Sequence, residues 1–280
     1  MRVPAAIAAV LIAGVAIGGA VGLLTRGDRS TPAAGTSPGT GTGGAATVQA
    51  RALYRQALAA MRGSAGFHYV AESTGGGPVQ TIAGDAGQSG GRQDITIAAS
   101  AGREQFTLIL VGGIVYFQGN VPALEDQLGV PAASAPGDQG KWISVSNQDG
   151  PYGVVAPGIT VADQVQETGL VPASMTSIRT AGGGATRLRG TLPAQQGAPG
   201  GTAQLDVAAG SHLPIAYVST LSVSGVRATT TTRFSGWGKA AAPAAPSGAV
   251  AWSTLGASAP PGGYGGGGAG GLSPSPTPQL

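Results

Sequence analysis

The sequence predicts an α+β fold, in which a large curved antiparallel sheet of about 10–11 strands forms an open half-barrel with helices on its concave face. An amphipathic helical pattern begins the foldable region, and short alternating patterns separated by glycine-containing turns follow it, with helical patterns between them in the middle. Strands joined by short turns pair antiparallel with their neighbours, and so large a sheet must curl. The helices are then expected to pack inside the curve.

Residues 1–26 contain a long apolar run. Val3–Leu24 carries no charge, and Arg2 and Arg26 flank it. Its length suits a membrane-spanning helix, which needs about 20 residues, and it also suits a long secretory signal peptide. Both interpretations predict an exported protein. A retained run anchors the protein on the extracytoplasmic face of the cell membrane, whereas a cleaved run makes it a secreted protein.

Two further segments differ in composition from the rest of the chain. Residues 27–46 are rich in Gly, Thr, Ser and Pro without apolar periodicity, which predicts a flexible linker. Residues 240–280 are rich in Ala, Pro and Gly, and they hold too little apolar surface to offset the entropy of ordering, which predicts a disordered tail. The folded domain is therefore expected to span residues 47–239.

The domain is expected to begin with a helix over residues 47–63, because apolar side chains recur there on one helical face and Gly63 ends the pattern. Residues 103–120 predict two strands joined by a tight turn at Gly112–Gly113. Two more helices are predicted, over residues 121–130 and 158–170. The remaining strands are predicted over residues 66–73, 78–85, 92–100, 140–146, 175–181, 184–192, 201–210, 213–225 and 226–237.

Composition excludes several classes of function. Charged residues make up only 10% of the chain, the net charge is +3, and Lys and Arg do not cluster, so nucleic acid is not expected as a partner. The absence of cysteine excludes disulfides, thiol catalysis, cysteine-ligated metals and cysteine-linked lipid. The two histidines, His68 and His212, are too few for a metal site. We therefore expect no cofactor.

The sequence also predicts a protein that is not an enzyme. Gly87–Gly91 matches the G-x-S-x-G motif around Ser89, but it lies between two predicted strands, and a nucleophile elbow needs a strand followed by a helix. Carboxylates on the predicted helices, such as Asp163 and Glu167, do not form a convincing acid–base pair. A hydrolase that uses Ser89 stays as the enzymatic alternative.

In their order along the chain, these segments resemble the actinobacterial cell-envelope lipoproteins of the LppX/LprG type, which have the LolA-like half-barrel fold. The resemblance covers about residues 47–246 and includes the paired hairpins over residues 82–118 with their G-x-x-Y element at Gly113–Tyr116. It also includes "KWISV", "LDVAAGSHLPIAYVSTL" and "TTTTRFSGWGKAAAPAAP". One feature departs from the family. Its members are anchored by an acylated cysteine, which this chain lacks, and this favours a retained N-terminal run as the anchor.

The resemblance implies a protein that binds a lipid or lipidated glycolipid in an apolar cavity between sheet and helices, for lipid carriage or envelope maintenance. The inward side chains of the first strands are the candidate cavity walls for such a lipid or other hydrophobic small molecule: Phe67, Tyr69, Ile95, Ile97, Phe106, Leu108, Leu110 and Tyr116. The same side chains also suit a filled core. The functional alternative is an envelope-anchored interaction or sensor module of the same fold, which contacts a membrane-protein partner.

Overall fold

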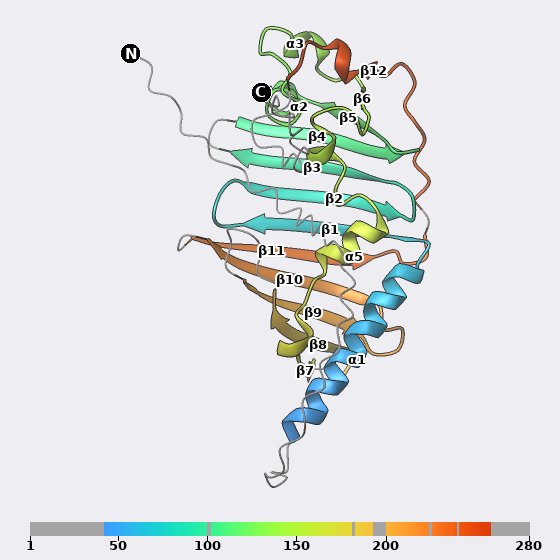
Figure 1. Cartoon of the computed structure of the whole chain (residues 1–280), viewed down its shortest axis with the longest axis vertical. Coiled ribbons are helices and arrows are strands. Elements are labelled where there is room, and N and C mark those ends of the chain that lie inside the picture. The colour runs from blue at the N-terminus through green and yellow to red at the C-terminus, as the bar shows by residue number, and fades with distance from the viewer. Residues whose placement is uncertain are drawn as a thin grey trace, which may run out of the picture.

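The computed structural model describes residues 42–99, 102–180, 183–192, 200–223, 226–239 and 241–258. Within them, twelve strands form one curved open sheet in the order β12-β6-β5-β4-β3-β2-β1-β11-β10-β9-β8-β7 (Figure 1). Neighbouring strands run antiparallel, except for the parallel pair of β12 and β6. The predicted α+β half-barrel is confirmed.

Strands β1–β11 follow the predicted alternating patterns closely, whereas β12 was not predicted. They are β1 Gly66–Thr74, β2 Val79–Gly87, β3 Gly91–Ala99, β4 Gly102–Val111, β5 Ile114–Gly119, β6 Ile143–Val145, β7 Thr176–Arg179, β8 Ala185–Thr191, β9 Thr202–Ala208, β10 Pro214–Val223, β11 Val226–Ser235 and β12 Val250–Ala251. The tight turn between β4 and β5 lies at Gly112–Gly113, as predicted. Both glycines have positive φ, which is the backbone conformation that a two-residue hairpin turn requires.

Helix α1 (Thr42–Gly63) and helix α5 (Val161–Glu167) cover the half of the sheet that contains β1 and β7–β11 (Figure 1). Ala50, Tyr54, Ala57 and Met61 are buried along one stripe of α1, which gives the helix its packing face. The structure begins α1 five residues before the expected domain start at residue 47. A capping box between Thr160 and Asp163 starts α5.

Short helices cover the other half of the sheet, β3–β6. They are α2 (Val121–Leu128), α3 (Ala135–Asp138) and α4 (Tyr152–Val155). Leu124 and Leu128 of α2 are fully buried in a second core cluster, together with Phe117 and Ile143. The sheet therefore carries two clusters of buried side chains, one in each half. The hydrogen-bonded strands β1, β2 and β3 connect the two halves.

The chain stays part of the fold beyond residue 239, where the domain was expected to end. β12 pairs with the open edge of β6, and the short helix η2 (Trp252–Thr254) follows it. The Trp252 indole N–H donates to the Leu128 carbonyl over 2.9 Å, and Trp252 and Leu255 pack against the second cluster. Residues 241–258 therefore differ from the disordered tail that composition predicts, because an unpaired strand edge and an apolar surface hold them.

The predicted N-terminal run, residues 1–26, and most of the predicted linker lie outside the described residues, as do residues 259–280. Among the helices that the structure describes, none combines the length and apolar character needed to span a bilayer.

Candidate functional site

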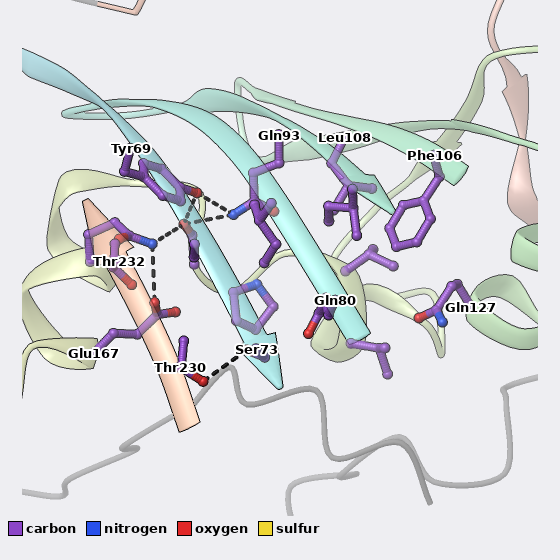
Figure 2. Close-up of a pocket in the computed structure, with 18 residues that line it drawn as sticks. Tyr69, Ser73, Gln80, Gln93, Phe106, Leu108, Gln127, Glu167, Thr230 and Thr232 are labelled. Atoms are coloured by element: carbon purple, nitrogen blue, oxygen red, sulfur yellow. Dashed lines mark hydrogen bonds between the residues drawn. The ribbon is translucent and has the colours of Figure 1, made fainter. Parts of the chain in front are cut away.

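A cavity lies on the concave face of the sheet, at the seam between the two core clusters (Figure 2). Strands β1–β4 and β11 form one wall, and residues from α2, α4, α5 and the segment between α4 and α5 form the other. Its volume is about 70 Å³. The lining comprises Tyr69, Ala71, Ser73, Gln80, Ile82, Gln93, Ile95, Phe106, Leu108, Gln127, Val154, Val155, Pro157, Gly158, Gln164, Glu167, Thr230 and Thr232.

The structure brings together part of the predicted set of cavity walls. Tyr69, Ile95, Phe106 and Leu108 line the cavity. Phe67, Ile97 and Leu110 also belong to buried clusters, but they do not line it, because core side chains surround them. Tyr116 alternates with the buried Val115 and Phe117, so its half-buried side chain lies on the opposite, convex face of β5.

Tyr69 reaches the cavity because glycine faces it on the next strand. Tyr69 and Gly84 are direct partners in the pairing of β1 with β2. A Cβ atom at Gly84 would overlap the Tyr69 ring, so only glycine leaves room for the ring to lie across β2. The ring then passes over the strand, and its hydroxyl group meets the segment between α4 and α5.

Three side chains donate hydrogen bonds to the Gly158 carbonyl. The donors are the Tyr69 hydroxyl at 2.9 Å, the Gln93 amide at 2.9 Å and the Gln164 amide at 2.8 Å. The Gln93 amide also donates to the Tyr69 hydroxyl oxygen (Figure 2). Because a carbonyl only accepts, these contacts fix both amides with their N–H groups toward Gly158. The network thereby joins the cover of the cavity to the sheet.

Glu167 adds a carboxyl group to this polar end of the cavity. Its pKa is raised to about 8, mainly by burial and also by the nearby Asp163 charge, while the hydrogen bond from Gln164 acts in the opposite direction. The Gln164 amide lies 3.2 Å from a Glu167 oxygen. At neutral pH the Glu167 carboxyl is therefore largely protonated, and it offers a hydrogen-bond donor as well as an acceptor.

Two buried polar side chains of the lining have no hydrogen-bond partner among the described residues. Gln80 and Thr232 are each only 8% exposed, and both face the cavity. Other polar groups are paired: Ser73 with Thr230, and Gln127 with the buried Glu104. No buried side-chain nitrogen or oxygen among the described residues lacks a hydrogen-bond partner, so the polar atoms of Gln80 and Thr232 are open to the cavity, where water or a ligand can bind to them.

The two ends of the cavity differ in polarity. Figure 2 shows Phe106 and Leu108 on one side of Gln80, and Tyr69 and Glu167 on the other. Lys, Arg and His are missing from the lining that the structure describes. The described residues also contain no cluster of side chains that could hold a metal ion. This arrangement suits an uncharged amphiphile with one apolar end and one hydrogen-bonding end.

Ser89 and the two histidines lie outside the cavity lining, whereas the carboxylate Glu167 belongs to it. Ser89 is exposed in the turn between β2 and β3, which is a strand–turn–strand context. His68 lies 2.8 Å from Asp85, and both side chains are largely exposed. His212 lies in the turn between β9 and β10. These positions do not bring Ser89 into the cavity.

Sequence reasoning missed the polar part of the lining. Gln80 and Gln93 lie two positions from Ile82 and Ile95 on the same strand faces, so strict alternation would have placed them inside. Gln164 and Gln127 carry no such signal, because their place depends on how the helices pack. The sequence signal that could have identified Gln80 and Gln93 was a polar residue at the alternate strand positions that otherwise carry inward-facing apolar residues.

Among the comparisons with known proteins, the one with solved structures finds similar proteins. Neither a protein-family model nor a curated protein matches the sequence. The structure is similar to lipoprotein LppX from Mycobacterium tuberculosis, at 14% identity and a TM-score of 0.45 over 71% of this chain and 98% of that one. It is similar to LprF from Mycobacterium bovis, at 12% identity and a TM-score of 0.44 over 71% and 95% of the two chains. A DUF1329 family protein from Desulfovibrio piger matches at 12% identity and a TM-score of 0.26, over 69% of this chain and 92% of its own.

Proposed function

We propose that this protein is a non-enzymatic envelope protein that binds a hydrophobic ligand, a lipid or lipidated glycolipid, in the cavity at the seam of the sheet. The observation that carries the proposal is that Gln80 and Thr232, which form no side-chain hydrogen bond with a described protein group, line the cavity beside an apolar wall. Their polar atoms remain accessible from the cavity, so a ligand with one polar and one apolar end can contact both surfaces.

The size of the cavity decides how a ligand enters. Pockets for small ligands usually measure about 300–1,000 Å³. The observed 70 Å³ therefore holds a few water molecules and not an acyl chain. Binding requires part of the cover to move away from the sheet. The four-residue helix α4 and Pro157 line the cavity next to Gly158, which side-chain hydrogen bonds from Tyr69 and Gln93 hold to the sheet.

The charge of the lining favours an uncharged polar end. A phosphate or carboxylate in the cavity would meet Glu167 and no cationic side chain among the lining residues. A hydroxyl group suits the site better, because it can donate to the carbonyl oxygens of Gln93 and Gln164 and exchange hydrogen bonds with Gln80. We therefore expect glycerol- or sugar-bearing acyl lipids to bind better than free fatty acids.

Lipid extraction and native mass spectrometry of the purified protein test the proposal. The wild-type protein is expected to carry bound lipid and to take up a fluorescent acyl probe. Ile82→Trp, which fills the seam with a large side chain, is expected to abolish uptake. Val79→Trp on the same strand is the matched control, because Val79 is exposed and does not line the cavity. Absence of both lipid and probe binding in the wild-type protein contradicts the carrier proposal.

The small volume favours a second candidate, an interaction or sensor module that contacts a membrane-protein partner. In that case the seam is a closed core with a few buried waters, and the wild-type protein binds neither lipid nor probe. Ile82→Trp would then overpack a filled core and lower the free energy of unfolding. The carrier proposal does not predict this loss, because its cavity opens.

A further inference from the structure

The outward face of α1 is a basic stripe. Arg51, Arg55 and Arg62 are exposed along it, to one side of the buried stripe that packs on the sheet. The helix contains neither Asp nor Glu. None of the three arginines forms an ion pair with any residue that the structure describes. A run of exposed cations without acidic partners leaves a positive surface that is open to an external anion.

A hollow of about 360 Å³ adjoins this stripe, between α1 and the short helix η1 (Pro172–Ser174). Val48, Tyr54 and Pro172 give it an apolar floor, and Arg51 and Arg55 flank it. Val48 is 63% exposed, which leaves its side chain available for contact. The hollow thus combines two cations with apolar surface, the combination found where proteins meet lipid head groups and the first acyl carbons.

Hydrogen bonds hold the hollow in shape. The Arg51 Nε–H donates to the Pro172 carbonyl over 2.6 Å, which fixes the guanidinium at the rim and leaves its terminal N–H groups without a protein acceptor among the described residues. The Tyr54 hydroxyl donates to the Thr168 carbonyl and accepts from the Leu170 amide, which ties α1 to the segment before η1. The Arg51 guanidinium is therefore positioned before any partner arrives.

The position of the hollow in the molecule points to a bilayer. The N-terminal end of α1 projects past β7 at one end of the sheet, while α2, with its acidic residues Glu125 and Asp126, lies at the other end (Figure 1). Residues 25–41 separate α1 from the apolar run Val3–Leu24. About 17 residues of this composition reach roughly 23 Å, so a membrane-inserted run keeps α1 close to the membrane surface.

We propose that the hollow on α1 docks on the surface of an anionic bilayer, with Arg51 and Arg55 contacting lipid phosphates and Val48 reaching the acyl boundary. A tethered domain needs only a few such contacts, because the tether keeps the local concentration of the membrane surface high. The docking orients the domain with α1 toward the bilayer. It is independent of whether the seam cavity carries lipid.

Fluorescence quenching in nanodiscs tests the docking. The chain contains no cysteine, so Ala59→Cys on the exposed face of α1 and Ala133→Cys near the opposite end each accept one fluorophore in the full-length protein. The discs contain phosphatidylcholine alone or phosphatidylcholine with phosphatidylglycerol, and a quencher on the lipid head group. We expect several-fold stronger quenching at Ala59→Cys in anionic discs than in neutral ones, and little quenching at Ala133→Cys. High salt is expected to remove the difference.

Charge-matched variants distinguish binding at the hollow on α1 from a general attraction between the protein's positive charge and an anionic bilayer. Arg51→Gln with Arg55→Gln is expected to abolish the anionic enhancement. Arg103→Gln with Arg227→Gln removes the same charge from exposed arginines on other elements, and it is expected to leave the enhancement intact. Equal quenching in both discs, or equal effects of the two double variants, overturns the proposal. Neither result bears on lipid extraction from the cavity.

Discussion

The two halves of the sheet hold their cover in different ways. In the half under α1 and α5, three tyrosines from three elements donate hydrogen bonds to the backbone of the cover. Tyr54 donates to Thr168, Tyr217 to Gly169 and Tyr69 to Gly158, each over 2.9 Å. Burial raises the pKa of all three phenols, so the hydroxyl groups stay protonated and can donate.

The half under α2–α4 uses apolar side chains instead. Phe106 and Phe117 stack with ring centroids 5.1 Å apart, and the fully buried Leu124 and Leu128 of α2 belong to the same cluster. At the start of α2 the Asn120 side chain accepts from the Ala123 amide, and near its end the Gln127 amide donates to the buried Glu104 of β4 over 2.7 Å. This half therefore relies mainly on apolar packing, with one buried polar pair between α2 and the sheet.

This difference indicates what the seam is for. A hydrogen bond from a tyrosine hydroxyl fixes the position of a backbone carbonyl, because the bond is directional. Apolar contacts are non-directional, so two apolar surfaces can shift against each other more readily. At the seam the two modes meet, and the polar atoms of Gln80 and Thr232 stay open to the cavity between them. The cover is therefore fixed at Gly158 and least constrained toward α4, which makes the α4 side the expected opening for a ligand.

The largest expected effects come from emptying each core in turn. Phe67→Ala and Phe117→Ala remove side chains that are 1% and 0% exposed, and each should lower the free energy of unfolding by about 3–5 kcal/mol. Because the ladder β1–β2–β3 joins the halves, urea unfolding should remain one transition in both variants. Tryptophan fluorescence and circular dichroism measure it. Two separate transitions would show that the halves unfold independently.

The tyrosine hydroxyls should differ in their contributions. Tyr54→Phe leaves the Thr168 carbonyl and the Leu170 amide without that partner, and it should cost about 1–3 kcal/mol. Tyr69→Phe should cost less, about 0.5–1.5 kcal/mol, because the Gly158 carbonyl keeps its bonds from Gln93 and Gln164. Urea denaturation of the two variants compares them. The reverse order would contradict the shared network at Gly158.

Glu167, at the polar end of the seam cavity, should make the free energy of unfolding depend on pH. Glu167 has its pKa raised from 4.5 to about 8. Between these values the folded protein holds a proton that the unfolded chain has released, so stability falls as pH rises through this window. Glu167→Gln removes this loss. It should stabilise the protein by about 1–3 kcal/mol near pH 9 and have little effect near pH 4.

Thermal unfolding of the wild-type protein and of Glu167→Gln across this pH range provides the measurement. Asp163→Asn is a useful comparison, because Asp163 contributes to the raised pKa of Glu167 but also caps α5 through Thr160. A pH dependence that persists in Glu167→Gln would assign the titration to another group.

Sequence periodicity predicted the parts of the fold that repeat locally. It identified α1, the turn at Gly112–Gly113 and strands β1–β11, because burial on one face leaves a regular pattern. It could not identify the hydrogen bonds that Tyr54 and Tyr217 make to the cover, because their acceptors lie 114 and 48 residues away in the sequence. Those contacts depend on how α5 and the segment after it dock on the sheet.

The same reasoning explains the error at the C-terminus and leads to the smallest expected effect. β12 has two residues and no periodicity, so only the open edge of β6 reveals it. Trp252→Phe removes the hydrogen bond to the Leu128 carbonyl and keeps most of the apolar contact, which should cost about 0.5–1.5 kcal/mol. Amide hydrogen exchange should speed up at the end of α2 and stay unchanged around Tyr54 and Tyr217. Faster exchange in both halves would mean that the C-terminal segment stabilises the whole sheet and not the second half alone.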